Sequence, residues 1–113
     1  MVVLFEIRQG DSGRTLSVQI KNADGSAIPP IPSSSTATWT MVHRTTKHRV
    51  TGSASIGGSN SDVLSYLFAS GDTAKPGRYD GVFQVTYPGG AVETFPTCSD
   101  QTDGITVEVC PLA

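Results

Sequence analysis

The sequence predicts an all-β domain, and three observations lead to this fold class. The β-branched residues number 30 of 113 (11 Val, 6 Ile and 13 Thr), and such residues favour pleated strands. Charged residues make up only 16% of the chain, which does not suit a helical bundle rich in Glu and Lys. The segment 15–21 alternates strictly, with Leu16, Val18 and Ile20 apolar and every residue between them polar. This alternation is typical of a strand with one buried face.

Similar stripes and short apolar runs recur between Gly-, Pro- and Ser-rich turns. The expected strands are residues 3–7, 15–20, 37–41, 50–56, 63–68, 79–87, 91–96 and 105–109. Short strands at this spacing are typical of a sandwich or barrel, so we expect about seven to eight antiparallel strands in one domain over residues 1–113. The run 63–68 is too evenly apolar to show which face is buried. The Pro-rich segment 28–32 should cross between sheets as extended chain, because proline has no N–H to donate.

One turn is more specific than the others. Pro76 and Gly77 precede Tyr79 at the start of an expected strand. This spacing resembles the tyrosine corner of immunoglobulin-like sandwiches, in which the Tyr hydroxyl bonds to nearby backbone. Trp39, on an earlier strand, fits the core tryptophan of such folds. We therefore expect an immunoglobulin-like β-sandwich in which these four residues have structural roles.

The loop 43–49 is strongly basic. Its cationic and titratable side chains are His43, Arg44, Lys47, His48 and Arg49. The loop holds no Asp, Glu or Cys, so the two histidines do not make a metal site, which needs three or four converging ligands. Two interpretations stay open, a solvated loop and a subunit contact with an acidic neighbouring surface. In the second, histidine protonation near pH ~6.5 would tune the contact.

The two cysteines allow two arrangements. If the last turn is centred near Gly104, Cys98 and Cys110 face each other across a terminal hairpin and could form a disulfide. If it is centred at Gln101, they do not meet. In a reducing cytoplasm the thiols would start free. The sequence leaves both states open.

Several classes of function are disfavoured. The net charge of −2 and the pI near 5.5 provide no basic field for nucleic acid. No apolar run approaches the roughly 18–20 residues of a membrane span, and the first residues do not look like a signal peptide. We find no nucleophile motif and no phosphate-binding loop. The expectation is therefore no enzyme, no metal, no cofactor, and partners that are neither nucleic acid nor membrane.

Two stretches carry a resemblance to a known family. Residues 5–20 contain F-E-I-R-Q-G-D-S-G-R-T-L, and residues 72–79 read D-T-A-K-P-G-R-Y, followed by E-T-F-P at 93–96. In this order and spacing they resemble the N-terminal domain family of phage baseplate upper proteins, which small stand-alone tailed-phage proteins share. The resemblance implies an immunoglobulin-like building block of the virion that attaches fibre parts to a tail core, and it implies no catalytic residues. Long family members continue into further domains, so a chain ending at Ala113 is expected to be a structural adaptor or a surface decoration on head or tail.

The resulting hypothesis is a structural protein of a tailed-phage virion, a tail, baseplate or fibre-attachment adaptor. Its expected partners are other virion proteins and further copies of itself, and its expected location is the virion, after synthesis in the host bacterial cytoplasm. One alternative is a head decoration protein on the capsid. Another is a host-surface carbohydrate-binding module, for which Tyr66 and Tyr87 are the aromatic residues expected to be exposed.

Overall fold

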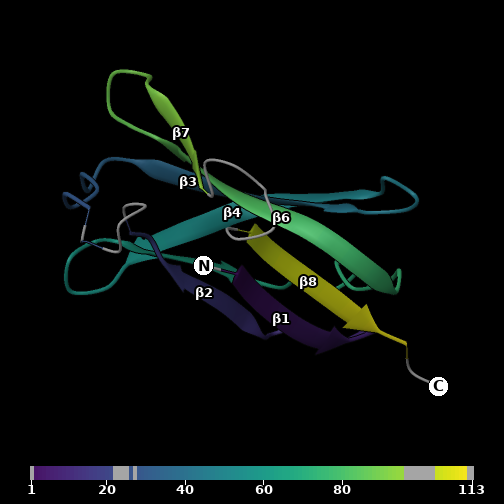
Figure 1. The fold of residues 1–113 in the computed structure, drawn as a ribbon. Coiled ribbons are helices and arrows are strands. Elements are labelled where there is room, and N and C mark those ends of the chain that lie inside the picture. The colour runs from purple at the N-terminus through teal and green to yellow at the C-terminus, as the bar shows by residue number, and fades with distance from the viewer. Residues whose placement is uncertain (1, 22–25, 27, 96–103, 112–113) are drawn as a thin grey trace.

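The computed structural model describes residues 2–21, 26, 28–95 and 104–111, and over these residues the protein is all-β with no helix (Figure 1). Because of this, no described segment is a helix that could span a membrane. The eight strands are β1 (Val2–Arg8), β2 (Thr15–Gln19), β3 (Thr36–His43), β4 (Arg49–Gly57), β5 (Val63–Leu67), β6 (Gly77–Thr86), β7 (Val92–Phe95) and β8 (Gly104–Cys110). Each of the eight expected strands corresponds to one of them.

Strand pairing follows one continuous path, β1-β8-β6-β3-β4-β5-β2, with β7 added beside β6. Strand β4 joins two groups of strands because its two parts have different partners. Up to Ala54 it pairs with β3, whereas Ser55–Gly57 pairs with β5. The sheet therefore wraps around its own core and is nearly barrel-like, with β1 and β2 as its two ends (Figure 1).

The expectation of purely antiparallel strands is wrong at one place. Strands β1 and β8 are parallel, in register from Val2 opposite Gly104 to Arg8 opposite Cys110. These are the first and last strands of the chain, so no short turn joins them and no hairpin forces them to run in opposite directions. Both strands turn apolar residues inward, including Ile7 and Val107, and the shared core fixes their register.

Strands β7 and β8 lie end to end along the same edge of β6. Phe95 pairs with Phe83, and two residues along β6, Gly81 pairs with Ile105. The terminal hairpin expected around the cysteines is therefore wrong, since β8 has β1 and β6 as its neighbours. Cys98 lies outside the described residues, so the Cys98–Cys110 disulfide stays a prediction.

An aromatic cluster fills the centre of the core. The Trp39 ring stacks on Tyr66 at 5.9 Å between centroids and tilts against Phe83 at 4.7 Å. Trp39 is completely buried, as its position on an early strand predicts. Gly81 on β6 makes room for the indole, because a Cβ there would lie 2.1 Å from the ring.

The structure also shows which face of segment 63–68 is buried and how the Pro-rich segment 28–32 is held. On β5, Leu64 and Tyr66 face the core, and Phe68 beyond the strand is buried as well. The Pro-rich segment 28–32 forms no strand. It is held by Ile31, whose side chain is buried and whose amide donates to the Ser61 carbonyl at 3.2 Å.

Candidate functional site

Two segments 62 residues apart are bonded to each other at one end of the molecule. The hydroxyl of Thr73 donates to the Asp11 carbonyl at 2.8 Å and accepts from the Gly10 amide at 3.0 Å. Thr73 is fully buried although it is polar, and these bonds satisfy it. The Gly10-Asp11 turn and the Asp72-Thr73 pair are the polar centres of the two stretches that carry the family resemblance. The bond between the two stretches could not be predicted from the sequence, because neither stretch shows its partner.

Asp72 closes the turn that follows β5. One of its carboxylate oxygens accepts from the Ala69 amide at 2.8 Å and from the Tyr66 hydroxyl at 2.5 Å. Burial, helped by this hydrogen bond and by the charge of Asp72, raises the pKa of Tyr66 above its ordinary value. Tyr66 is only 4% exposed. The prediction that Tyr66 is exposed is therefore wrong, because its ring packs in the core.

The turn before β6 has the geometry of a tyrosine corner. The Tyr79 hydroxyl donates to the Lys75 carbonyl at 2.7 Å, which is the backbone bond that the Pro-Gly-x-Tyr spacing predicts. The side chain is fully buried, and burial raises the pKa of its phenol. Gly77 has a φ of 132°, a conformation that favours glycine. A Cβ there would lie 2.2 Å from the imidazole of His43.

His43 is part of this corner and does not belong to the exposed loop in which the sequence placed it. It is 8% exposed, and its Nε2 lies 3.0 Å from the Pro76 carbonyl. Since a carbonyl only accepts, Nε2 carries the proton. Its Nδ1 accepts from the amides of Thr45 and Thr46, both at 3.1 Å. The neutral imidazole thus ties the β3–β4 turn to the turn before β6.

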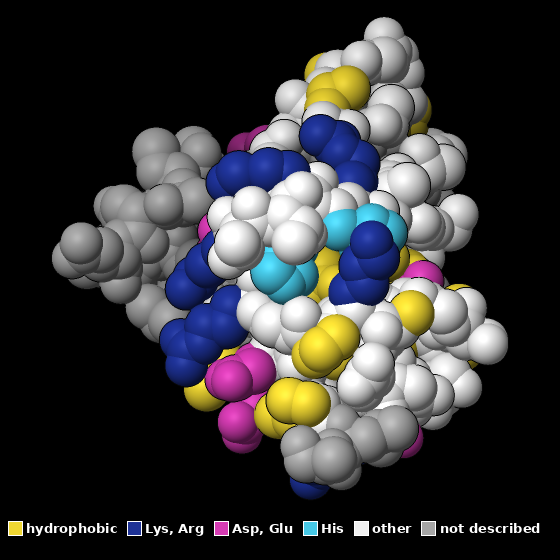
Figure 2. Space-filling view, turned by 90° about the vertical axis from the view of Figure 1, so that its right-hand side faces the viewer, with side chains coloured by type: hydrophobic (Ala, Val, Ile, Leu, Met, Phe, Trp, Pro, Cys, Tyr) yellow, Lys and Arg dark blue, Asp and Glu magenta, His cyan; other side chains and the backbone are white. Residues whose placement is uncertain are grey.

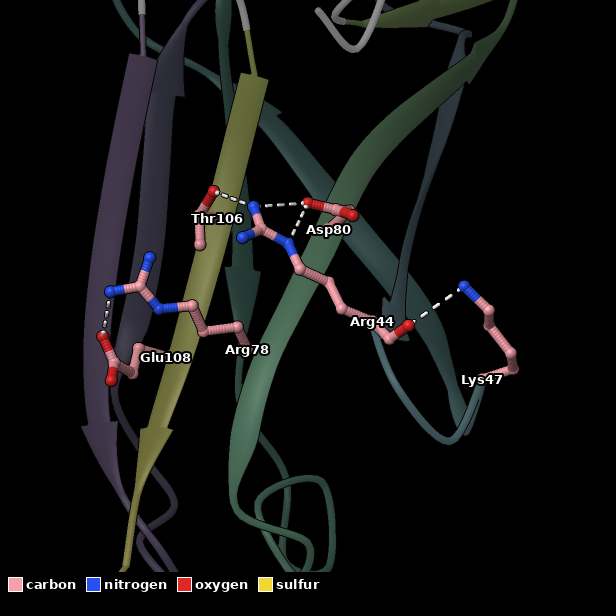
Figure 3. Close-up of polar contacts among 6 residues, drawn as sticks. All are labelled: Arg44, Lys47, Arg78, Asp80, Thr106 and Glu108. Carbon is pink, nitrogen blue, oxygen red and sulfur yellow. Dashed lines mark hydrogen bonds and ion pairs between the residues drawn. The ribbon is translucent and has the colours of Figure 1, made fainter. Parts of the chain in front are cut away.

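Two of the arginines at this end are paired with acids (Figure 3). Arg44 contacts Asp80 through its Nε at 2.9 Å and its Nη2 at 2.8 Å, and Nη2 also donates to Thr106. Arg78 pairs with Glu108 at 3.4 Å. The pairs lie side by side on the outer face of the sheet, and only Glu108 among their four side chains is less than well exposed. Each pair therefore contributes little to stability. The ion pairs hold the two arginine side chains along the outer face of the sheet at this end.

Four further basic residues have no acidic partner in the part of the chain that the structure describes. They are Lys47, His48, Arg49 and Lys75. Figure 2 shows Lys and Arg side chains gathered around the two histidines on this face. We call these four residues, with Arg44 and Arg78, the basic end. Lys75 and Arg78 join the loop residues only in the folded chain, where the Arg44 amide donates to the Arg78 carbonyl at 2.9 Å.

Lys47 adds an observation about this surface. Its φ is 63°, a left-handed conformation that costs a side-chain-bearing residue about 1–2 kcal/mol. Its Nζ donates to the Arg44 carbonyl at 3.0 Å, and its side chain is exposed. A glycine would adopt this backbone conformation at lower cost.

The basic end is suited to contact with an acidic surface. Its loops are held together by buried polar bonds, so the cations are displayed on a rigid support. Among the described residues, no group of three or more His, Cys, Asp or Glu is placed to hold a metal ion.

Comparisons of the chain with protein-family models, with curated proteins and with solved structures find no match.

Proposed function

We propose that the protein is a structural component of a tailed-phage virion, acting as a tail, baseplate or fibre-attachment adaptor. One observation carries this proposal. The two stretches that resemble the baseplate upper protein family are bonded to each other through Thr73 and Asp11, and they support the basic end. The two stretches that carry the resemblance are thus neighbours in the folded chain, and together they present the basic end as a contact surface.

We further propose that the fold is an immunoglobulin-like sandwich. Three features support it: the Tyr79 corner at the start of β6, the buried Trp39 on β3, and the division of pairing along β4. Taken as two layers, the strands would be β1, β8, β7, β6, β3 and the first part of β4 against β2, β5 and the rest of β4.

Assembly is the mechanism that this surface supports. Lys47, Arg49 and Lys75 are exposed and would pair with carboxylates on a neighbouring virion protein. A partner that repeats around a symmetry axis would bind one copy per subunit. Contacts between exposed charges are screened by salt, so the association should weaken as ionic strength rises.

Cryo-electron microscopy of intact particles tests the proposal directly. Three or six copies ringing the tail, with the basic end against a neighbour, are expected for an adaptor. Particles assembled with Arg49→Glu should hold fewer copies than wild type. Lys21→Glu is a matched control, because Lys21 is exposed at the far end of β2 and its loss should not change the copy number.

Two results would contradict the adaptor. Hundreds of copies over the shell would make the protein a head decoration, with the basic end as the capsid contact. Complete absence from the particle would overturn the virion proposal. A carbohydrate-binding module would need an exposed aromatic platform, and the burial of Tyr66 removes one of the two rings that the sequence offered for it.

A further inference from the structure

Strand β1 is an edge strand that lacks several of the usual protections against pairing. It is seven residues long, contains neither proline nor glycine, and keeps an unbroken register with β8. The strand lies at the margin of the sheet, with β8 on one side only (Figure 1). Natural proteins blunt such edges with short strands, lysines, prolines or bulges. The free edges at β2 and β7 belong to shorter strands of five and four residues.

The direction of the free backbone groups follows from one hydrogen bond. The Gln9 amide donates to the Cys110 carbonyl at 2.8 Å. Because the amides of a strand point alternately to its two sides, the amides of Leu4, Glu6 and Arg8 point away from β8. Two carbonyls on this side already accept one bond each, that of Glu6 from Arg14 and that of Arg8 from the Asp11 amide. A carbonyl can accept a second bond.

The side chains on this edge carry two opposite charges, those of Glu6 and Arg8. Glu6 lies opposite Glu108 in the register, and Glu108 is paired with Arg78. Arg8 donates to the Pro111 carbonyl at 2.9 Å. Within the described residues, neither Glu6 nor Arg8 is in an ion pair. The two are exposed, opposite in sign and two residues apart, so they point to the same side of the strand.

We propose that two copies of this protein pair through antiparallel β1 strands about a twofold axis at Ile7. In this register Glu6 of each copy lies opposite Arg8 of the other. Both residues direct their backbone groups outward, so each such pair exchanges two hydrogen bonds, and the twofold axis repeats the pair. Opposite charges in facing positions stabilise a strand pair, and like charges destabilise it. The second copy is favoured over an unrelated strand because this edge is complementary to itself.

Charge exchange tests the pairing. In analytical ultracentrifugation from micromolar to millimolar concentration, the wild-type chain should form a dimer. Arg8→Glu should weaken the dimer roughly tenfold or more, because it places two carboxylates opposite each other at both pairs. The double variant Glu6→Arg with Arg8→Glu should restore it. Lys21→Glu is the matched control, since it makes the same charge change at an exposed position outside β1.

Hydrogen exchange gives a second readout that needs no variant. The amides of Glu6 and Arg8 should exchange quickly in dilute solution and slowly at high concentration, whereas the Ile7 amide, which faces β8, should stay protected throughout. A monomer at millimolar concentration would overturn the proposal, and so would a dimer without concentration-dependent protection of Glu6. Failure to restore the dimer in the double variant would overturn this register. None of these results depends on whether the protein is part of a virion.

Discussion

At the residue scale, single polar atoms decide how the ends of the strands are held. The Tyr79 hydroxyl and the Thr73 hydroxyl each join a buried position to the backbone of a turn. A hydrogen bond of this kind adds only about 1 kcal/mol when made, but removing one partner leaves a desolvated group behind. Replacing either residue should therefore lower the free energy of unfolding by more than the hydrogen bond itself contributes.

Replacing Tyr79 by phenylalanine should lower the free energy of unfolding by about 1–3 kcal/mol, because the Lys75 carbonyl loses its donor. Urea unfolding followed by tryptophan fluorescence measures the change. Tyr87→Phe is the control: its hydroxyl bonds the exposed Glu93 at 2.7 Å, so its loss should cost less. Equal costs would contradict a structural corner at Tyr79.

Gly81→Ala should destabilise the protein by about 1–3 kcal/mol, the usual cost of overpacking a core. The added methyl would lie 2.1 Å from the Trp39 ring, so the indole must move. The same urea titration measures the loss in free energy of unfolding. The fluorescence of Trp39 in the native state should also shift. Gly57→Ala, where a Cβ meets nothing within 4 Å, should be close to neutral. If both variants behave alike, the close packing of Gly81 on Trp39 is contradicted.

At the element scale, the β3–β4 turn combines a structural and a display role. His43 fixes the turn from inside through three hydrogen bonds, while Lys47 and Arg49 point their charges outward. The two roles make opposite demands at Lys47, where the backbone favours glycine.

Lys47→Gly should therefore raise the free energy of unfolding by about 1 kcal/mol, since the left-handed φ of 63° no longer opposes a side chain. Thermal unfolding by circular dichroism measures the gain. The same variant should lower the number of copies in the particle. Thr45→Gly, at a position without positive φ, should destabilise instead. A loss of stability in Lys47→Gly would show that the lysine side chain supports the turn.

At the level of the whole molecule, the fold raises the pKa of all three tyrosines. Burial, with the hydrogen bond and charge of Glu93, raises the pKa of Tyr87 to about 12. Burial is also the first cause of the raised pKa values of Tyr66 and Tyr79. The protein has no other tyrosine, so its phenol titration reports the state of the entire fold.

The native protein should therefore show little phenolate absorbance near pH ~10, where unfolded tyrosines titrate. The unfolded chain loses phenol protons before the folded one, so the contribution of the tyrosines to the free energy of unfolding should be constant below this pH and fall as the pH rises toward 12 and beyond. Phenolate absorbance at alkaline pH measures the titration in the native protein, and repeating it across a denaturant series measures the free energy of unfolding at each pH. A native titration near pH ~10 would contradict the buried and bonded phenols.

The strands could be predicted from the chain alone, because the alternation at segments such as 15–20 is a pattern of neighbouring residues. The Pro76-Gly77-x-Tyr79 spacing likewise predicts its own turn, since the bonded atoms are four residues apart. The basic character of 43–49 is also a local property and could be read directly.

The other features could not be predicted in this way, because they depend on which distant segments meet in the folded chain. The parallel pairing of β1 with β8 follows from a shared core and from no turn that the sequence could show. The burial of His43 depends on Pro76, and that of Thr73 on Asp11. Lys75 and Arg78 enter the basic end for the same reason. A residue's neighbours along the chain predict its backbone, whereas its exposure and its partners are set by the segments packed against it.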